Sequence, residues 1–280
     1  MIVVTGATGN VGRPLVAALA AAGERVTALS RRSADEAGTH EGVRHRQADL
    51  AAPESLEPVL DGAEALYLLV AGGGEGLNPR DILDVAKAGG VRRIVLQSSQ
   101  ITGTRPEAVS HAHLRAFEDA VRQAGPDWTV LRPSGFASNA RMWAETVRSQ
   151  RTVVAPFGDV ALPVVDPSDI AEVAAAALRD SRHAGRTYEL TGPAAITPRE
   201  QTRAIGEALG TPVRFTGMTR DEARAAMLRF MPGPVADGTL SILGEPSAAE
   251  RRVSPDVEQV LGRPPRTFAE WAARNAAVFS

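Results

Sequence analysis

The chain begins with a short apolar strand that runs directly into three regularly spaced glycines, and this feature constrains the fold most. Residues 1–5 are apolar and β-branched, Gly6, Gly9 and Gly12 follow, and residues 12–22 are rich in Ala and Leu. Gly6 permits a sharp exit from the strand, and Gly9 removes a side chain where the backbone must approach a pyrophosphate. Gly12 allows the helix to pack close to the strand. A strand, glycine loop and helix in this order predict a dinucleotide site; the alternative is a simple tight turn.

The start of the following helix adds an electrostatic reason for this prediction. Its N-terminal N–H groups carry partial positive charge and attract phosphate groups. We therefore expect the loop to hold the phosphates of a dinucleotide. The expected binding residues of the loop are Gly6, Thr8, Gly9, Asn10, Val11 and Gly12.

The remainder of the chain alternates between strand-like and helix-like segments. This alternation predicts an α/β fold of the Rossmann type, a doubly wound parallel sheet with helices on both faces. Asn78 is the expected N-cap of a helix over 78–90, and Asp169 is expected to cap or favour the start of a later helix. The expected strands cover residues 1–5, 25–31, 43–50, 65–72, 91–99, 128–136 and 186–192.

The expected organisation is a large domain followed by a smaller lobe. Residues 1–155 form the dinucleotide-binding domain, with a later strand and helix contributed from about 160–192. Residues 193–280 are short helical pieces separated by Pro and Gly, which predict a mostly helical substrate lobe. At helical spacing Met227, Phe230 and Met231 favour one buried face; the alternative is that they line a substrate box.

Composition excludes several other classes of protein. The formal charge of −2 offers no basic field for nucleic acid. No apolar run is long enough to span a bilayer, and no signal peptide is evident, so we expect no membrane partner. The absence of cysteine excludes thiol chemistry and is typical of a reducing cytoplasm. No His-x-x-x-His pair or carboxylate cluster predicts a metal site, and we expect a monomer or homodimer.

The end of the second expected strand indicates which dinucleotide binds. An NAD site usually has an acidic residue there, which binds the ribose 2′-hydroxyl. This chain has Ser30, Arg31 and Arg32 instead. Two guanidinium groups can pair with a 2′-phosphate, which predicts NADP(H). The alternative is an exposed arginine pair on a surface loop.

Several motifs together resemble the NmrA-like group of atypical short-chain dehydrogenases. These are TGATGNVG at 5–12, ADL at 48–50, VLQSS at 95–99 and WTVLRPSGFASN at 128–139. VVDPSDIAEVAAAAL at 164–178 and the tail LGRPPRTFAEWAARNAAVF are also similar to this group. The resemblance covers almost the whole chain and implies a Rossmann-type domain with a small C-terminal substrate lobe.

The resemblance also implies positions for parts of the cofactor. It places Asp49 and Leu50 beside the adenine, with Asp49 accepting from the amino group. It places Leu69, Val70 and Ala71 beside the adenosine ribose, although the two hydrophobic residues are equally suited to a core strand. It places Pro133, Ser134 and Phe136 near the nicotinamide.

The chain lacks the catalytic pair of standard short-chain dehydrogenases, Tyr-x-x-x-Lys. Its only tyrosines are Tyr67 and Tyr188, and Ala71 and Gly192 stand four positions later. The only lysine is Lys87, which has no tyrosine near it in sequence. The sequence therefore contains no tyrosine and lysine with the spacing that this catalytic pair requires.

Candidates to replace the pair follow the fifth expected strand. His113, or His111, would transfer protons near the nicotinamide; the alternative is a pair of surface histidines at a helix start. Ser98 is an expected cofactor contact and Ser99 an expected catalytic residue, because α/β sheets place ligands at the carboxyl ends of their strands. The alternative is that these serines bind local backbone groups. A serine hydrolase is disfavoured because no G-x-S-x-G elbow is present.

Three kinds of function fit these features. The first is an NADPH-dependent reductase of a quinone, an enone or a similar small apolar carbonyl compound. The negative charge that develops on such an acceptor during hydride transfer is delocalised, which lessens the need for a strong acid. The second is a non-catalytic NADP(H) sensor that binds a partner protein. A third is a non-redox isomerase or cyclase on the same fold. We favour the reductase, because the lobe after residue 193 implies a substrate chamber.

Overall fold

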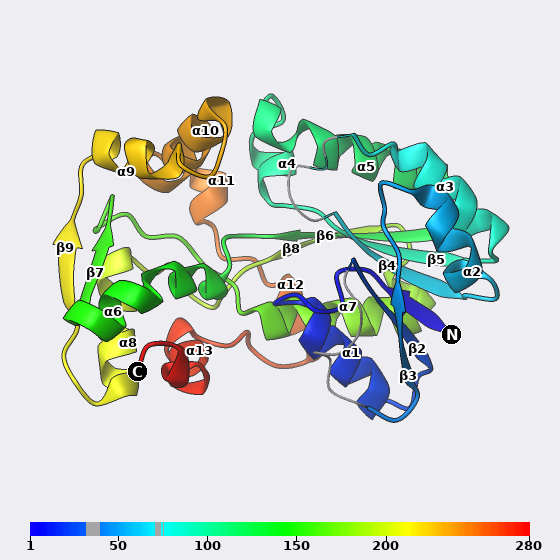
Figure 1. The fold of residues 1–280 in the computed structure, drawn as a ribbon, viewed down its shortest axis with the longest axis horizontal. Coiled ribbons are helices and arrows are strands. Elements are labelled where there is room, and N and C mark those ends of the chain that lie inside the picture. Colours follow the sequence, from blue (N-terminus) through cyan, green and yellow to red (C-terminus); the bar gives the residue numbers. More distant parts are fainter. Residues whose placement is uncertain (32–39, 71–73, 75) are drawn as a thin grey trace.

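A seven-stranded parallel sheet forms the centre of the computed structural model, which describes residues 1–31, 40–70, 74 and 76–280 (Figure 1). The strand order is β3-β2-β1-β4-β5-β6-β8, with every neighbouring pair parallel. This arrangement confirms the predicted doubly wound Rossmann-type fold. The strands are β1 (Ile2–Val4), β2 (Val26–Ser30), β3 (Val43–Gln47), β4 (Ala65–Leu69), β5 (Arg93–Gln97), β6 (Asp127–Pro133) and β8 (Arg186–Leu190).

Helices cover both faces of this sheet, which explains why the central strands are apolar along their whole length. One hydrophobic core joins the sheet to α1 (Gly12–Ala21), α7 (Pro167–Arg179) and α12 (Asp256–Leu261). A second core lies on the other face. It contains residues from η1 (Pro53–Leu56), α2 (Glu57–Leu60), α3 (Pro79–Ala88) and α5 (Ala112–Gln123).

Side-chain caps begin two of these helices. The Asn78 side chain accepts from the backbone N–H of Arg80, as the sequence predicts. Helix α7 is capped by Asp166, which accepts from the backbone N–H of Ser168 at 2.8 Å. Asp169 lies in the first turn, but it is fully buried and its carboxylate binds arginines from the C-terminal tail. Asp169 is therefore not the cap, which lies three residues earlier, but it is an acidic residue in the first turn, where the sequence also expects it to favour the helix start.

A second, smaller unit lies on the left of Figure 1, beyond the edge of the main sheet. Its two-stranded parallel sheet pairs β7 (Thr152–Ala155) with β9 (Arg214–Gly217). Its core also includes η3 (Ala137–Trp143), α6 (Ala144–Gln150), α8 (Pro198–Leu209) and α13 (Phe268–Arg274). Residues 137–155, which the sequence division assigns to the first domain, therefore pack with the later segment. Neither β7 nor β9 was expected from the sequence, because their pairing is set only by tertiary packing.

The helical part of this unit packs around a third, small core. Helices α9 (Arg220–Met227) and α10 (Gly233–Gly244) bury Met227, and Met231 packs partly against them. The side chain of Phe230 is 66% exposed, so the prediction of one buried face holding all three residues was wrong for Phe230. A tight turn after α9 carries Phe230 off the helix face.

One arginine attaches this helical part to the main sheet. Arg105, which follows α4 (Ile101–Thr104), donates to Glu250 of α11 (Ala248–Arg251) at 2.6 and 2.9 Å. Glu250 is only 1% exposed, and Thr104 donates to the same carboxylate at 3.1 Å.

Within the described residues no helix is long and apolar enough to cross a bilayer.

A buried carboxylate holds β5, β6, α4 and α5 together. Glu118 is 2% exposed and accepts from Ser98 at 2.6 Å and from Thr102 at 2.7 Å. Arg132 donates to both oxygens, at 3.0 and 2.6 Å, and Arg122 donates at 2.8 Å. Burial alone would raise the pKa of Glu118, but hydrogen bonds from Arg132, Ser98, Thr102 and Arg122 lower it to about 2.

We predict that Glu118→Gln lowers the free energy of unfolding at pH 7 by about 3 kcal/mol, because it leaves the part-buried guanidinium groups of Arg132 and Arg122 without their buried carboxylate. The folded-state pKa lies below the ordinary value of 4.5, so the ionised carboxylate stabilises the fold above that pH. This stabilisation is lost as the pH falls toward 2. The difference between wild type and variant in urea unfolding should therefore shrink across this range.

Glu145→Gln is the matched control, because Glu145 is 79% exposed and forms an ion pair with Arg148 on the helix surface. It should change the free energy of unfolding by less than about 0.5 kcal/mol. A Glu118→Gln effect that stays constant between neutral and acidic pH would contradict the assigned pKa direction.

Candidate functional site

The glycine loop is held against the neighbouring strands by backbone hydrogen bonds. Thr5 donates from its backbone N–H to the carbonyl of Tyr67 at 3.1 Å, and Ala7 donates to the carbonyl of Leu29 at 3.1 Å. The Thr5 hydroxyl accepts from the backbone N–H of Leu69 at 2.8 Å. The loop therefore crosses the carboxyl ends of β2, β1 and β4, where a doubly wound sheet binds its ligands.

Glycine is required in this loop for two different steric reasons. Gly6 has a φ of +63°, and a Cβ there would lie 2.6 Å from Leu69 Cδ2. A Cβ on Gly12 would lie 2.1 Å from the carbonyl oxygen of Gly6. The close approach at Gly12 is therefore to the loop itself rather than to the strand. Helix α1 has no side-chain cap and no acidic residue in its first turn, so its N-terminus is suited to an anion.

A cavity of about 530 Å³, here called the front cavity, lies between the glycine loop and the ends of β2, β3 and β4. Its size is in the range typical of cofactor sites. It brings together predicted residues from four separate segments. Those that line it are Gly6, Thr8, Gly9, Ser30, Arg31, Asp49, Leu50 and Leu69.

The charges of the front cavity come from Arg31 and Asp49. The backbone carbonyl of Arg31 accepts from the Gln47 side chain at 3.1 Å. The Arg31 guanidinium forms no ion pair with any described residue. Asp49 is fixed in a turn, because its carboxylate accepts from the backbone N–H of Ala51 at 3.0 Å. Ser30 stands where an NAD site usually has a carboxylate, so among the described residues no acidic side chain at the end of β2 repels a 2′-phosphate.

Three other loop residues do not line the front cavity. Val11 is 3% exposed and belongs to the core beneath α1, and Gly12 packs against the loop backbone. The Asn10 side chain turns the other way, donating to Ser138 at 3.2 Å and accepting from Arg141 at 3.1 Å. The side chains of Asn10 and Val11 are therefore directed away from the front cavity, so only the backbone N–H groups of these three residues could contact a dinucleotide there.

Four further expected cofactor contacts lie outside the front cavity; three of them are buried and Phe136 is partly buried. Val70 packs in the core on the α3 side, and the Ser98 hydroxyl is held by Glu118. Pro133 is buried at the end of β6, where its carbonyl accepts from Gln100, and Phe136 packs against the core beside Val165. Ser98 is thus a structural residue rather than a cavity residue. Arg32 and Ala71 lie outside the described residues.

Sequence reasoning missed several residues that line the front cavity. Leu56 of η1, Leu77 before α3 and Gly74 close its apolar side. Leu56 is 2% exposed and reads in the sequence as an ordinary core position. No local signal marks these residues, because the packing of η1 and the β4–α3 connection against the loop brings them together.

His113 lies in the first turn of α5, beside a residue that lines the front cavity. A Cβ on Gly74 would lie 2.6 Å from His113 Cδ2, so the imidazole packs against the Gly74 backbone. Burial lowers the pKa of His113, and the charge of Arg115 lowers it further. Burial, with His113 and Arg115, lowers the pKa of His111 to about 4. Both imidazoles are half-buried and neutral at pH 7, rather than exposed surface groups.

The other candidate groups are used locally or lie far from the cavity. The Ser99 hydroxyl accepts from the backbone N–H of Ile101 at 3.3 Å. Tyr67 is fully buried in the sheet, where its hydroxyl donates to Gln97 and burial raises its pKa. Tyr188 is on the edge strand β8, and its hydroxyl lies 2.8 Å from His183 Nδ1. Lys87 is exposed on α3. Neither tyrosine lines the front cavity.

Metal chemistry has no visible basis in the part of the chain that the structure describes. No group of three or more His, Asp or Glu side chains there is arranged to hold an ion. The front cavity is lined by the glycine loop, by apolar side chains, and by the charged side chains of Arg31 and Asp49.

Comparison with known proteins agrees with this geometry. A family model described as NAD(P)H-binding matches residues 6–181. The (4-alkanoyl-5-oxo-2,5-dihydrofuran-3-yl)methyl phosphate reductase of Streptomyces griseus is 39% identical, covering 100% of this chain and 99% of that protein. The NAD(P)H azoreductase of Xenophilus azovorans is 31% identical, covering 100% and 99%.

Solved structures show the same fold. The NADPH-dependent quinone oxidoreductase of Escherichia coli, complexed with NADPH, superposes with a TM-score of 0.81 at 24% identity, covering 98% of this chain and 99% of that one. A mutant NmrA superposes with a TM-score of 0.77 at 19% identity, covering 99% and 95%. The chain therefore belongs to the NAD(P)H-binding family, and the Streptomyces griseus and Xenophilus azovorans relatives, at 39% and 31% identity, are both named as reductases.

Proposed function

We propose that this chain is an NADPH-dependent reductase of a small conjugated carbonyl compound, of the enone or quinone class. The observation that carries the proposal is the position of the two tyrosines. Tyr67 is buried in the sheet and Tyr188 is on the edge strand, so neither lines the front cavity. A reaction at this site must proceed without a phenolic acid, which favours an acceptor whose negative charge is delocalised.

The residues around the front cavity fit this chemistry. When bound, a nicotinamide dinucleotide supplies a hydride. The conjugated acceptor spreads the developing charge onto its carbonyl oxygen, and a hydrogen-bond donor there is sufficient. His113 is neutral because burial and the Arg115 charge lower its pKa, so its N–H donates to that oxygen while solvent provides the proton.

The names of the relatives support the same substrate class. The name of the Streptomyces griseus relative describes a 5-oxo-2,5-dihydrofuran ring with an alkanoyl group, in which a ring double bond is conjugated to carbonyl groups. The Escherichia coli relative, 26% identical over 96% of each chain, is named a quinone oxidoreductase. Both names describe electron-poor acceptors rather than simple ketones.

We assign the C-terminal segment 193–280 to the substrate side of the site. A Cβ on Gly238 of α10 would lie 3.4 Å from the Ser110 hydroxyl, one residue before His111. Helix α10 therefore packs beside the start of α5, where His113 lies. The segment also carries Glu250, which anchors it to Arg105 next to the sheet.

We predict a preference for NADPH over NADH of about tenfold or more, because Arg31 pairs with the 2′-phosphate through charge-assisted hydrogen bonds. Arg31→Ala should remove most of this preference by weakening NADPH binding and leaving NADH binding unchanged. Isothermal titration calorimetry with both cofactors measures this. Arg25→Ala, at the other end of β2, is the matched control and should leave both affinities unchanged. Equal affinities for the two cofactors in wild type would refute the assignment of NADPH.

We predict that His113→Ala lowers kcat for an enone or quinone by about 10- to 100-fold, because it removes a donor to the developing oxyanion. NADPH affinity should stay unchanged. The measurement is NADPH oxidation followed by absorbance with a panel of quinones and enones. His111→Ala is the control and should keep most of the activity, because His111 Nδ1 is already 3.0 Å from the Ser110 hydroxyl.

The same assay separates the reductase from the non-catalytic regulator. Tight NADPH binding without turnover of any acceptor in the panel would contradict the reductase proposal and favour the sensor. Turnover of an unactivated ketone at a comparable rate would contradict the proposed substrate class.

A further inference from the structure

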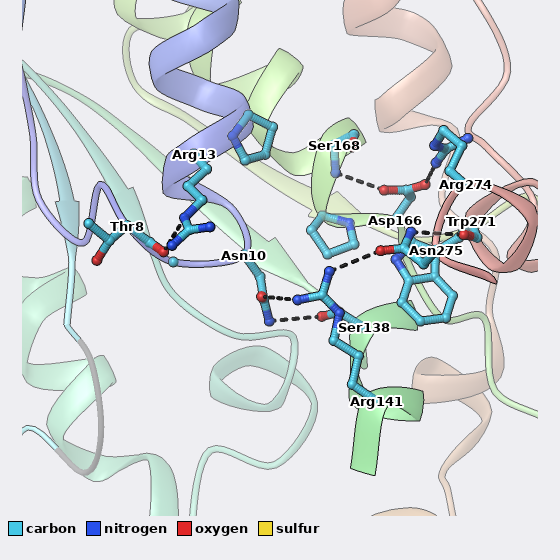
Figure 2. Close-up of a pocket in the computed structure, with 13 residues that line it drawn as sticks. Thr8, Asn10, Arg13, Ser138, Arg141, Asp166, Ser168, Trp271, Arg274 and Asn275 are labelled. Atoms are coloured by element: carbon cyan, nitrogen blue, oxygen red, sulfur yellow. Dashed lines mark hydrogen bonds and ion pairs between the residues drawn. The ribbon is translucent and has the colours of Figure 1, made fainter. Parts of the chain in front are cut away.

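A second cavity, here called the back cavity, lies beside the glycine loop and shares only Thr8 and Gly9 with the front cavity. Figure 2 shows the residues that line it. Its volume is about 410 Å³, which suits a small ligand. It is formed where the N-termini of α1 and α7 meet η3 and α13. Three arginines from three separate elements line it: Arg13 of α1, Arg141 of η3 and Arg274 of α13.

Arg141 is positioned by neutral groups rather than by a carboxylate. Its two terminal nitrogens donate to the side-chain oxygens of Asn10 at 3.1 Å and Asn275 at 2.9 Å. Two of its five N–H donors are therefore used, and its charge stays uncompensated. Figure 2 shows the guanidinium between these two asparagines, which come from opposite ends of the chain.

Arg13 is likewise held by a neutral group. Its Nε donates to the backbone carbonyl of Thr8 at 2.9 Å, and its terminal nitrogens have no partner among the described residues. The single carboxylate that lines the cavity is Asp166, and both of its oxygens are already used. One accepts from the Ser168 backbone N–H and the other pairs with Arg274. The lining therefore carries a net charge of about +2, from three guanidinium groups and one carboxylate.

We propose that the back cavity binds a small oxyanion, of the phosphate or phosphate-monoester class. Arg13 and Arg141 supply the free donors, and their fork geometry matches phosphate oxygens. The bound anion compensates the charge that the protein itself leaves unpaired.

This site is separate from the dinucleotide site but shares a wall with it. Thr8 and Gly9 line both cavities, while the Asn10 side chain faces only the back one. The ligand of the back cavity is therefore bound alongside the dinucleotide rather than in its place. The proposal does not depend on the reaction proposed above, because binding is measured without turnover.

The test is calorimetric titration of the whole protein with inorganic phosphate and with phenyl phosphate, at constant ionic strength. Saturable binding in the millimolar range or tighter is expected for at least one of them. Tighter binding of phenyl phosphate would identify a phosphate ester as the natural class, and tighter binding of inorganic phosphate would identify the free ion. Arg141→Gln and Arg13→Gln should each weaken binding about tenfold or more.

Two controls locate the binding. Arg182→Gln changes an arginine that is 85% exposed and paired with Asp180, so it should leave phosphate binding unchanged. Arg31→Gln changes the cation of the front cavity and should also leave it unchanged. NADPH affinity measured at saturating phosphate should not fall.

The proposal is overturned if neither probe binds, or if binding is the same in Arg141→Gln as in wild type. It is also overturned if phosphate competes with NADPH and Arg31→Gln abolishes its binding, because the anion would then occupy the dinucleotide site. Circular dichroism of each variant verifies that lost binding does not reflect unfolding.

Discussion

The contact between Gly12 and the carbonyl oxygen of Gly6 is the constraint on which the rest of the site depends. Any side chain at position 12 would overlap that oxygen, at 2.1 Å. The glycine loop is therefore closed upon itself, with the start of α1 directly beneath it. This compact loop is thin enough to separate two cavities, so the same few backbone atoms form one wall of each.

Buried carboxylates at the start of α7 hold the end of the chain in place. Asp169 is fully buried and binds Arg266, with the Arg266 backbone N–H donating at 2.7 Å. Asp166, three residues before Asp169, pairs with Arg274 of α13. These ion pairs bring α13 next to the glycine loop, although the two segments lie at opposite ends of the sequence. Without these ion pairs the back cavity would lack the wall that Trp271 and Arg274 of α13 form.

A buried carboxylate organises the interior beside the carboxyl end of β5. Ser98 follows β5, and its hydroxyl donates to Glu118, to which Arg132 also donates. This cluster joins β5, β6 and α5. The neighbouring His113 is neutral, which suits hydrogen bonding better than acid catalysis.

Short-range features of the sequence were enough to predict the parallel sheet, the glycine loop and most of the front cavity. The glycine spacing, the apolar strands and Ser30–Arg31 act locally, so their consequences could be read without a structure. Leu56, Gly74 and Leu77 could not be found in this way, because which face a residue presents depends on the elements packed against it. The pairing of β7 with β9 and the meeting of Arg13, Arg141 and Arg274 depend on contacts between distant segments. Tertiary packing alone decided them, since no local pattern encodes which remote surfaces become neighbours.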